Sequence, residues 1–276
     1  MKRALVTRPA GEAQRWVSAL QRQGWQAEAL PLIEIAPAAD PQPLRQARAR
    51  LGDYDALMFV SAPAVEQFLA DRPWAGTDPR ADAADAEAVP PSSPDAWPRC
   101  WAPGPATARA LLAAGVPPER IDQPAAAAEQ FDSESLWQVV GPQVGAGHRL
   151  LIVRGQSDGV AVSPAGNGRD WLASQCREQG GRIDWCVAYR RRAPAWSASQ
   201  RELAQAASQD GTVWLLSSSE ALDHLAALLP GFDWSRARAL ATHPRIAQAA
   251  ARLGFGLVQT SRPALDDMLL HLESMA

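Results

Sequence analysis

Residues 3–24 read RALVTRPAGEAQRWVSALQRQG, and this stretch is the pattern on which the rest of the chain is built. The short apolar run 3–7 predicts a β-strand. Residues 12–23 then predict a helix, because apolar side chains recur at helical spacing, and Gly24 ends it. The apolar positions of that helix are Ala13, Trp16, Val17 and Leu20. The stretch therefore predicts a strand, a loop and a helix, in that order.

The same pattern returns in the second half of the chain at a constant spacing. Pairs that lie 157 residues apart are Gly11 with Gly168, Gly24 with Gly181, Pro37 with Pro194 and Ser61 with Ser218. The first strands of the two copies, at Leu5 and Ile152, are 147 residues apart, because about ten residues are inserted near 156–165. Since strands alternate with helices through both copies, we predict an α/β fold with mostly parallel sheets flanked by helices.

Length and charge restrict the class of protein. The 276 residues are enough for two domains, and a formal net charge of -3 provides no basic field for nucleic acid or for an anionic membrane. The N-terminus reaches Arg8 after four uncharged residues, and no run of eighteen apolar residues follows. We therefore expect a cytoplasmic protein with no nucleic-acid or membrane partner.

Several kinds of cofactor chemistry lack the residues that they need. Lys2 is the only lysine, which argues against a pyridoxal aldimine, a Schiff-base aldolase or a P-loop NTPase. No glycine-rich nucleotide motif follows the first strand, and the four histidines and three cysteines show no metal-ligand spacing. We therefore expect no cofactor and no metal, and we interpret the cysteines as buried thiols.

Ligands of parallel α/β folds bind beyond the carboxyl ends of the strands, so the loops there carry the candidate binding residues. The expected loops hold small hydroxyls, arginines and free backbone N–H groups in front of helices, which suit anions. Plain N-capping is the structural alternative for each of them. The candidates are Thr7, Arg8, Ser61, Gly104, Thr107, Arg154, Ser217, Ser218, His243 and Arg245.

Tyr189 is one of only two tyrosines, and it precedes three consecutive arginines. On strand propensity alone it is a residue of an amphipathic strand.

Taken together, these segments resemble the uroporphyrinogen-III synthase family over nearly the whole chain. The resemblance is carried by Leu5–Pro9, Leu30–Ile35, Phe59–Ser61 with Ala64 and Val65, Gly104–Ala108, Asp132–Glu134, Gly168 and Arg169 with Trp171 and Leu172, Tyr189–Arg191 with Pro194, and His243–Ala247. The chain departs from the family at Val60, Ala62 and Pro63 and in the length of two loops.

The resemblance implies a domain arrangement that the repeat alone would not give. Residues 1–35 join 191–276 in one α/β domain, and 40–186 form the other. Segments 36–39 and 187–190 pair as a two-stranded connector that would permit hinge motion. The stretch 73–99, rich in Pro, Asp and Ala, is expected to be a disordered loop of the second domain.

The resemblance also implies a cofactor-free, cyclising hydro-lyase of tetrapyrrole and heme biosynthesis. It would close hydroxymethylbilane, a linear tetrapyrrole, into uroporphyrinogen III. The substrate loses water, and its last pyrrole ring is inverted through a spiro intermediate. Tyr189 aligns with a recurrent tyrosine of the family and is the candidate catalytic proton donor. We expect a monomer that takes its substrate from the preceding enzyme of the pathway.

Two other classes of protein remain open on the sequence. A two-domain binding protein for an anionic small molecule would use the same loops without turnover. A sugar-nucleotide transferase with two facing α/β domains would be stabilised by nucleotide.

Overall fold

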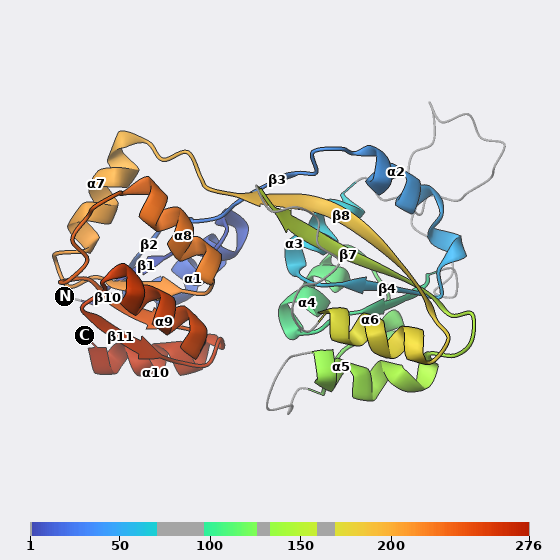
Figure 1. The fold of residues 1–276 in the computed structure, drawn as a ribbon. Helices are drawn as coiled ribbons and strands as arrows, with labels where there is room; N and C mark the ends of the chain where they lie inside the picture. Colours follow the sequence, from blue (N-terminus) through green and yellow to red (C-terminus); the bar gives the residue numbers. More distant parts are fainter. Residues whose placement is uncertain (1, 71–96, 126–132, 159–168, 276) are drawn as a thin grey trace. The chain divides into compact units, whose positions relative to one another are not determined.

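The chain folds into two compact units. The computed structural model describes residues 2–70, 97–125, 133–158 and 169–275. The first unit combines Met1–Ile35 with Arg191–Ala276, and the second is Ala36–Arg190. In Figure 1 the first unit carries the dark blue and the orange to red elements, and the second carries the elements from lighter blue through green to yellow.

The first unit is built around five strands. Its elements are β1 (Arg3–Val6), α1 (Ala10–Arg22), β2 (Gln26–Ala29), α7 (Ala198–Ala207), β9 (Val213–Leu216), α8 (Ser219–Leu228), β10 (Arg238–Ala241), α9 (Pro244–Leu253), β11 (Leu257–Thr260) and α10 (Leu265–Met275). The sheet order is β11-β10-β9-β1-β2, and all four neighbouring pairs are parallel. The carboxyl ends of these strands therefore meet at one edge.

The second unit contains a six-stranded sheet, of which two strands, β3 and β8, extend past the unit boundaries at 35/36 and 190/191. Its elements are β3 (Glu34–Pro37), α2 (Gln42–Ala49), β4 (Ala56–Phe59), α3 (Ala62–Leu69), β5 (Arg99–Trp101), α4 (Pro105–Ala113), β6 (Ile121–Asp122), α5 (Ser133–Val140), β7 (Arg149–Ser157), α6 (Arg169–Glu178) and β8 (Arg182–Arg192), with short 3-10 turns at Leu51–Asp53, Pro118–Arg120 and Gly141–Gln143. The order is β3-β8-β7-β4-β5-β6, and β4 runs parallel to both β5 and β7. The fold is thus α/β with mostly parallel sheets flanked by helices.

The two sheets share one strand order, which is the structural counterpart of the sequence repeat. The order β11-β10-β9-β1-β2 of the first unit corresponds to β6-β5-β4-β7-β8 of the second. Each unit takes one strand-helix-strand segment from one copy of the repeat and its remaining strands from the other. The second sheet has one additional strand, β3, which lies beside β8.

The centre of the first unit's sheet is buried on both faces. Alternate residues of its central strand point to opposite sides, so that Trp214 and Leu216 enter one cluster while Val213 and Leu215 enter the other. Residues of α7, α8 and α9 complete the first cluster, and residues of α1 and α10 complete the second. Burial on both faces explains why β9 reads as a continuous apolar run.

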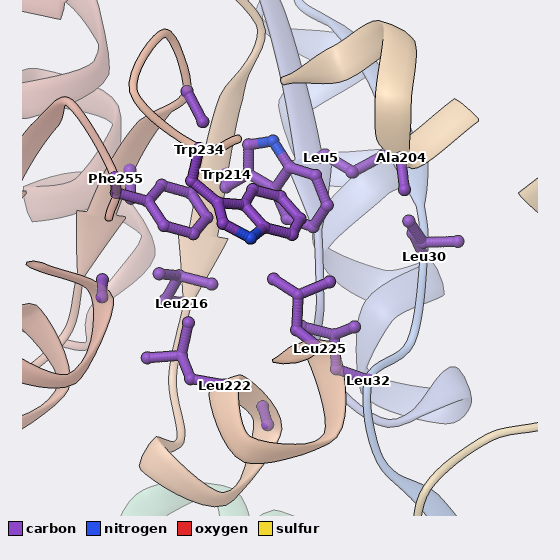
Figure 2. Close-up of a cluster of buried hydrophobic side chains, with 14 of the residues drawn as sticks. Leu5, Leu30, Leu32, Ala204, Trp214, Leu216, Leu222, Leu225, Trp234 and Phe255 are labelled. Carbon is purple, nitrogen blue, oxygen red and sulfur yellow. The ribbon is translucent and has the colours of Figure 1, made fainter. Parts of the chain in front are cut away.

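Aromatic rings fill the larger of these clusters, as Figure 2 shows. The ring of Trp234 stacks on Phe255 with centroids 5.1 Å apart, and Trp214 meets Trp234 edge to face at 5.6 Å. Trp214 has no exposed surface. Such pairs add stability beyond the area that they bury, so this group anchors the first unit.

Two sequence predictions differ from the structure at their boundaries. The prediction that Arg154 lies in a loop is wrong: Arg154 and Gly155 lie inside β7, which continues to Ser157 beyond its last pairing with β4 because the long β8 remains beside it. The loop predicted over 73–99 lies outside the described residues as far as 96. Its last part belongs to the fold, since Trp97 is buried and Arg99 begins β5.

None of the helices in the described ranges is long and apolar enough to cross a lipid bilayer.

Candidate active site

Three neighbouring strands of the second unit bring Tyr189, Ser61 and Gly155 together. Tyr189 lies on β8 and is 3% exposed, and its phenol oxygen is 3.1 Å from the hydroxyl oxygen of Ser61, which follows β4. Gly155 on β7 lies against the ring, because a Cβ added there would approach three ring carbons within 2.7 Å. A hydrogen-bonded phenol and serine hydroxyl therefore lie at the end of β4, where helix α3 begins.

Ser61 also serves α3 directly. Its extended backbone (φ -167°, ψ 162°) places it as the N-cap, and its hydroxyl oxygen accepts a hydrogen bond from the backbone N–H of Ala64 at 3.3 Å. The capping alternative is thus confirmed for this serine. The hydroxyl can make a second hydrogen bond, because an oxygen that accepts from the Ala64 N–H can still donate its own O–H to Tyr189 or to a ligand.

The next helix of the second unit begins without a side-chain cap. Gly104 is the N-cap of α4, and Pro105 follows it at the first helical position. Thr107 is 5% exposed, and its backbone N–H bonds to the carbonyl of Gly104 at 3.1 Å. Gly104 therefore leaves the start of α4 open to an anionic group, whereas the side chain of Thr107 faces inward.

The guanidinium of Arg154, a residue of β7, stacks on an aromatic ring. Its guanidinium carbon is 4.7 Å from the ring centroid of Trp185 on the neighbouring β8. The stacking fixes the positive charge of Arg154 beside β8.

The candidates of the first unit lie at the carboxyl edge of its own sheet. Thr7 is 1% exposed and donates its hydroxyl to the carbonyl of Leu215 at 2.6 Å, so it ties β1 to β9. Arg8 pairs with Glu12 at 3.0 Å and lies over the ring of Trp16. Both side chains are engaged within the unit.

The serines and the histidine of the first unit differ in how they cap their helices. Ser218 is the N-cap of α8 without a side-chain capping bond, and Ser217 beside it is half-buried. His243 caps α9, because its Nδ1 accepts a hydrogen bond from the backbone N–H of Arg245 at 3.1 Å. This leaves Nε2 of the exposed His243 as a donor, next to the exposed Arg245.

Sequence reasoning missed two features of these edges. No role for Gly155 was predicted from the sequence, although a glycine inside a strand can mark the close approach of another group. The ion pair of Arg191 with Glu220 at 2.8 Å, beside the start of α8, joins residues too far apart in sequence to be paired by pattern.

A pocket of about 480 Å³ lies elsewhere in the second unit and does not coincide with Tyr189. Its lining residues Asp55, Arg99, Gln143 and His148 lie at or near the amino ends of β4, β5 and β7. Burial lowers the pKa of His148, whose ring stacks on Trp101. The pocket thus lies at the edge opposite to the one where Ser61 follows β4.

The cysteines are confirmed as buried free thiols. Burial raises the pKa of Cys100, Cys176 and Cys186 to about 12, which keeps them protonated and removes them as nucleophiles. Within the described ranges, no three His, Cys, Asp or Glu side chains gather as metal ligands.

The geometry separates the candidates into two sets, one in each unit. Ser61, Gly104, Thr107, Arg154 and Tyr189 belong to the second unit, and Thr7, Arg8, Ser217, Ser218, His243 and Arg245 belong to the first. Nearly all of them lie at helix N-termini or strand ends at the carboxyl edges. These features define a two-unit α/β protein whose candidate ligand loops lie beyond its parallel strands.

Comparison with known proteins identifies the family. The profile described as "Uroporphyrinogen-III synthase HemD" matches residues 14–269. Uroporphyrinogen-III synthase of Escherichia coli K12 is 28% identical over 97% of this chain and 98% of its own length. That of Synechococcus elongatus is 30% identical over 70% of this chain and 62% of its own length. The chain belongs to the uroporphyrinogen-III synthase family.

A solved structure agrees at the level of the fold. The uroporphyrinogen-III synthetase of Helicobacter pylori 26695 is 14% identical, with a TM-score of 0.54 over the whole of both chains. The chain is therefore an enzyme of a family that acts on a small tetrapyrrole, and the alternative of a binding protein without catalysis is not favoured.

Proposed function

We propose that the chain cyclises hydroxymethylbilane to uroporphyrinogen III, acting as a hydro-lyase with Tyr189 as the proton donor. The family match supports the overall reaction. The observation that carries the role of Tyr189 is the 3.1 Å contact between its phenol and the Ser61 hydroxyl.

The first step is the departure of the terminal hydroxyl group. Tyr189 donates its proton to that oxygen as the C–O bond breaks, so that water leaves and an azafulvene cation remains. The substituted carbon of the last pyrrole ring attacks the cation and forms the spiro intermediate. Fragmentation and recombination then invert the ring and close the macrocycle. The pyrrole carbon that forms the last bond loses a proton, which restores the phenol and balances the reaction.

Ser61 fits the role of orienting the phenol. Because its oxygen already accepts from the Ala64 N–H, it can donate its own O–H to the oxygen of Tyr189. The phenol proton is then directed toward the substrate rather than back into the protein.

The remaining candidates would hold the eight carboxylates of the substrate. The open start of α4 at Gly104 and the exposed pair His243 and Arg245 offer donors to carboxylates. Arg154, stacked on Trp185, adds a positive charge to this set. Ser217 and Ser218 would bind through hydroxyls. Thr7, Thr107 and Arg8 are engaged internally, so we assign them to shaping the binding loops.

Product analysis tests the reaction most simply. The purified chain is incubated with hydroxymethylbilane, and the oxidised type I and type III porphyrins are separated. We expect the type III isomer to predominate. Type I alone, as formed without enzyme, would show that the chain does not catalyse the inversion and would revive the binding-protein alternative.

We further propose that the enzyme needs no cofactor, acts as a monomer in the cytoplasm and receives substrate from the preceding enzyme. Activity lost on dialysis against a chelator and restored by one metal would contradict the first point. Thermal stabilisation by a nucleotide would favour the sugar-nucleotide transferase.

A further inference from the structure

Gly155 lies directly against the ring of Tyr189. The two residues belong to neighbouring strands, β7 and β8, and a Cβ added to Gly155 would lie within 2.7 Å of Cε1, Cε2 and Cζ of the phenol. Carbon atoms in contact prefer roughly 3.5–4.0 Å. The ring therefore occupies the space that any side chain at position 155 would fill.

We propose that Gly155 is a positioning residue for the reaction: its missing side chain lets the phenol of Tyr189 lie against β7 with its hydroxyl at Ser61. The inference rests on the proposed function, in which that hydroxyl protonates the leaving group. Tyr189 is 3% exposed, so the ring is enclosed and a displacement at Gly155 is transmitted to its oxygen.

Substitution of Gly155 should move the ring and spare the backbone. The three atoms nearest to an added Cβ all belong to the far end of the Tyr189 side chain, and the backbone of Gly155 is not in the left-handed region. Gly181, at the start of β8, provides the contrast. An added Cβ there would lie 2.9 Å from the backbone carbonyl oxygen of Cys176. Gly181→Ala therefore strains the backbone at a site that does not contact the phenol.

Steady-state kinetics separates positioning from stability. We expect Gly155→Ala to lower kcat by roughly 10- to 100-fold, since a displacement of about 1 Å has effects of this size, while KM changes by less than about threefold. The control Gly181→Ala should lower Tm while kcat stays within about threefold of wild type. Equal kcat losses in the two variants, matched by equal losses of Tm, would overturn the proposal.

A double-variant cycle tests whether Gly155 acts through the phenol hydroxyl. In a Tyr189→Phe background, Gly155→Ala should cost less than about threefold, because the group that it positions is already gone. If the kcat loss of the double variant equals the product of the losses in the two single variants, the two residues act independently and the proposal is contradicted.

The phenol itself can be observed independently of activity. The chain has two tyrosines, so ¹³Cζ-tyrosine labelling gives two signals, and Tyr54→Phe identifies the one from Tyr189. Gly155→Ala should shift that signal, and Gly181→Ala should not. An unchanged signal overturns the positioning role. Turnover of Tyr189→Phe within twofold of wild type overturns the proposed proton donor instead, and the labelling experiment then still decides the geometry.

Discussion

The two units share one strand order, yet they carry different side chains at matching positions of the carboxyl edge. By the spacing of the repeat, Leu32 stands where Tyr189 stands and Arg8 stands where Gly155 stands. Leu32 has no exposed surface and belongs to the core, and Arg8 is paired with Glu12. In the first unit, the position that matches Tyr189 is used for core packing, and the position that matches Gly155 is used for an ion pair.

The helix caps diverge in the same way. Ser61 caps α3 through its hydroxyl, whereas the matching Ser218 makes no side-chain capping bond. His243 caps α9, whereas the matching α4 begins at Gly104. Strands buried on both faces require apolar residues, whereas several residue types can stand at the start of a helix. The two units therefore share a topology, and only the second carries the proposed proton donor.

Tyr189→Phe tests this specialisation and has the largest expected effect. The change keeps the ring against Gly155 and removes one O–H. Product formation should fall by roughly 10²- to 10⁴-fold, the range for a general acid, with Tm and KM nearly unchanged. A structural tyrosine would instead lower Tm and spare turnover.

Trp214→Ala tests the other side of the comparison, the packing of the first unit. Trp214 is fully buried against Trp234 and Phe255, and its match in the second unit is the smaller Leu57. We expect the free energy of unfolding of the first unit to fall by about 3–5 kcal/mol, as measured by urea denaturation. A loss below 1 kcal/mol would show that the aromatic cluster is not the anchor.

Ser61→Ala and Ser218→Ala form a matched pair with a smaller effect. Removing the Ser61 hydroxyl frees the phenol, so kcat should fall roughly 3- to 10-fold, as for loss of one hydrogen bond. Ser218→Ala should raise KM and leave kcat unchanged. Identical kinetic effects of the two substitutions would argue against separate roles.

His243→Ala should have the smallest effect on the fold. It removes the bond from the Arg245 N–H and should cost about 1 kcal/mol or less, seen as a small decrease in Tm. Its effect on KM reports separately on carboxylate binding. A KM equal to that of wild type would show that the His243 side chain does not bind the substrate.

The repeat made much of the fold predictable. Positions such as Gly24 and Gly181 mark the same point of each copy, and the apolar runs around Leu5, Leu57 and Trp214 predict buried parallel strands. The extension of β7 through Arg154 was not predictable, because it depends on β8 continuing beside it.

The types of residue in the candidate site were predictable from the sequence, but the contacts between them were not. The sequence indicated hydroxyls and arginines before helices, but Ser61 and Tyr189 are 128 residues apart, and only the sheet order places them together. The internal use of the Thr7 hydroxyl likewise depends on β9, its neighbour in space.

The most direct test of Tyr189 as proton donor changes the leaving group. A bilane whose terminal hydroxyl is replaced by an acetate ester needs no proton to lose its leaving group. With this substrate, the defect of Tyr189→Phe relative to wild type should shrink from roughly 10²- to 10⁴-fold to a few-fold. A defect of the same size with both substrates would contradict the account.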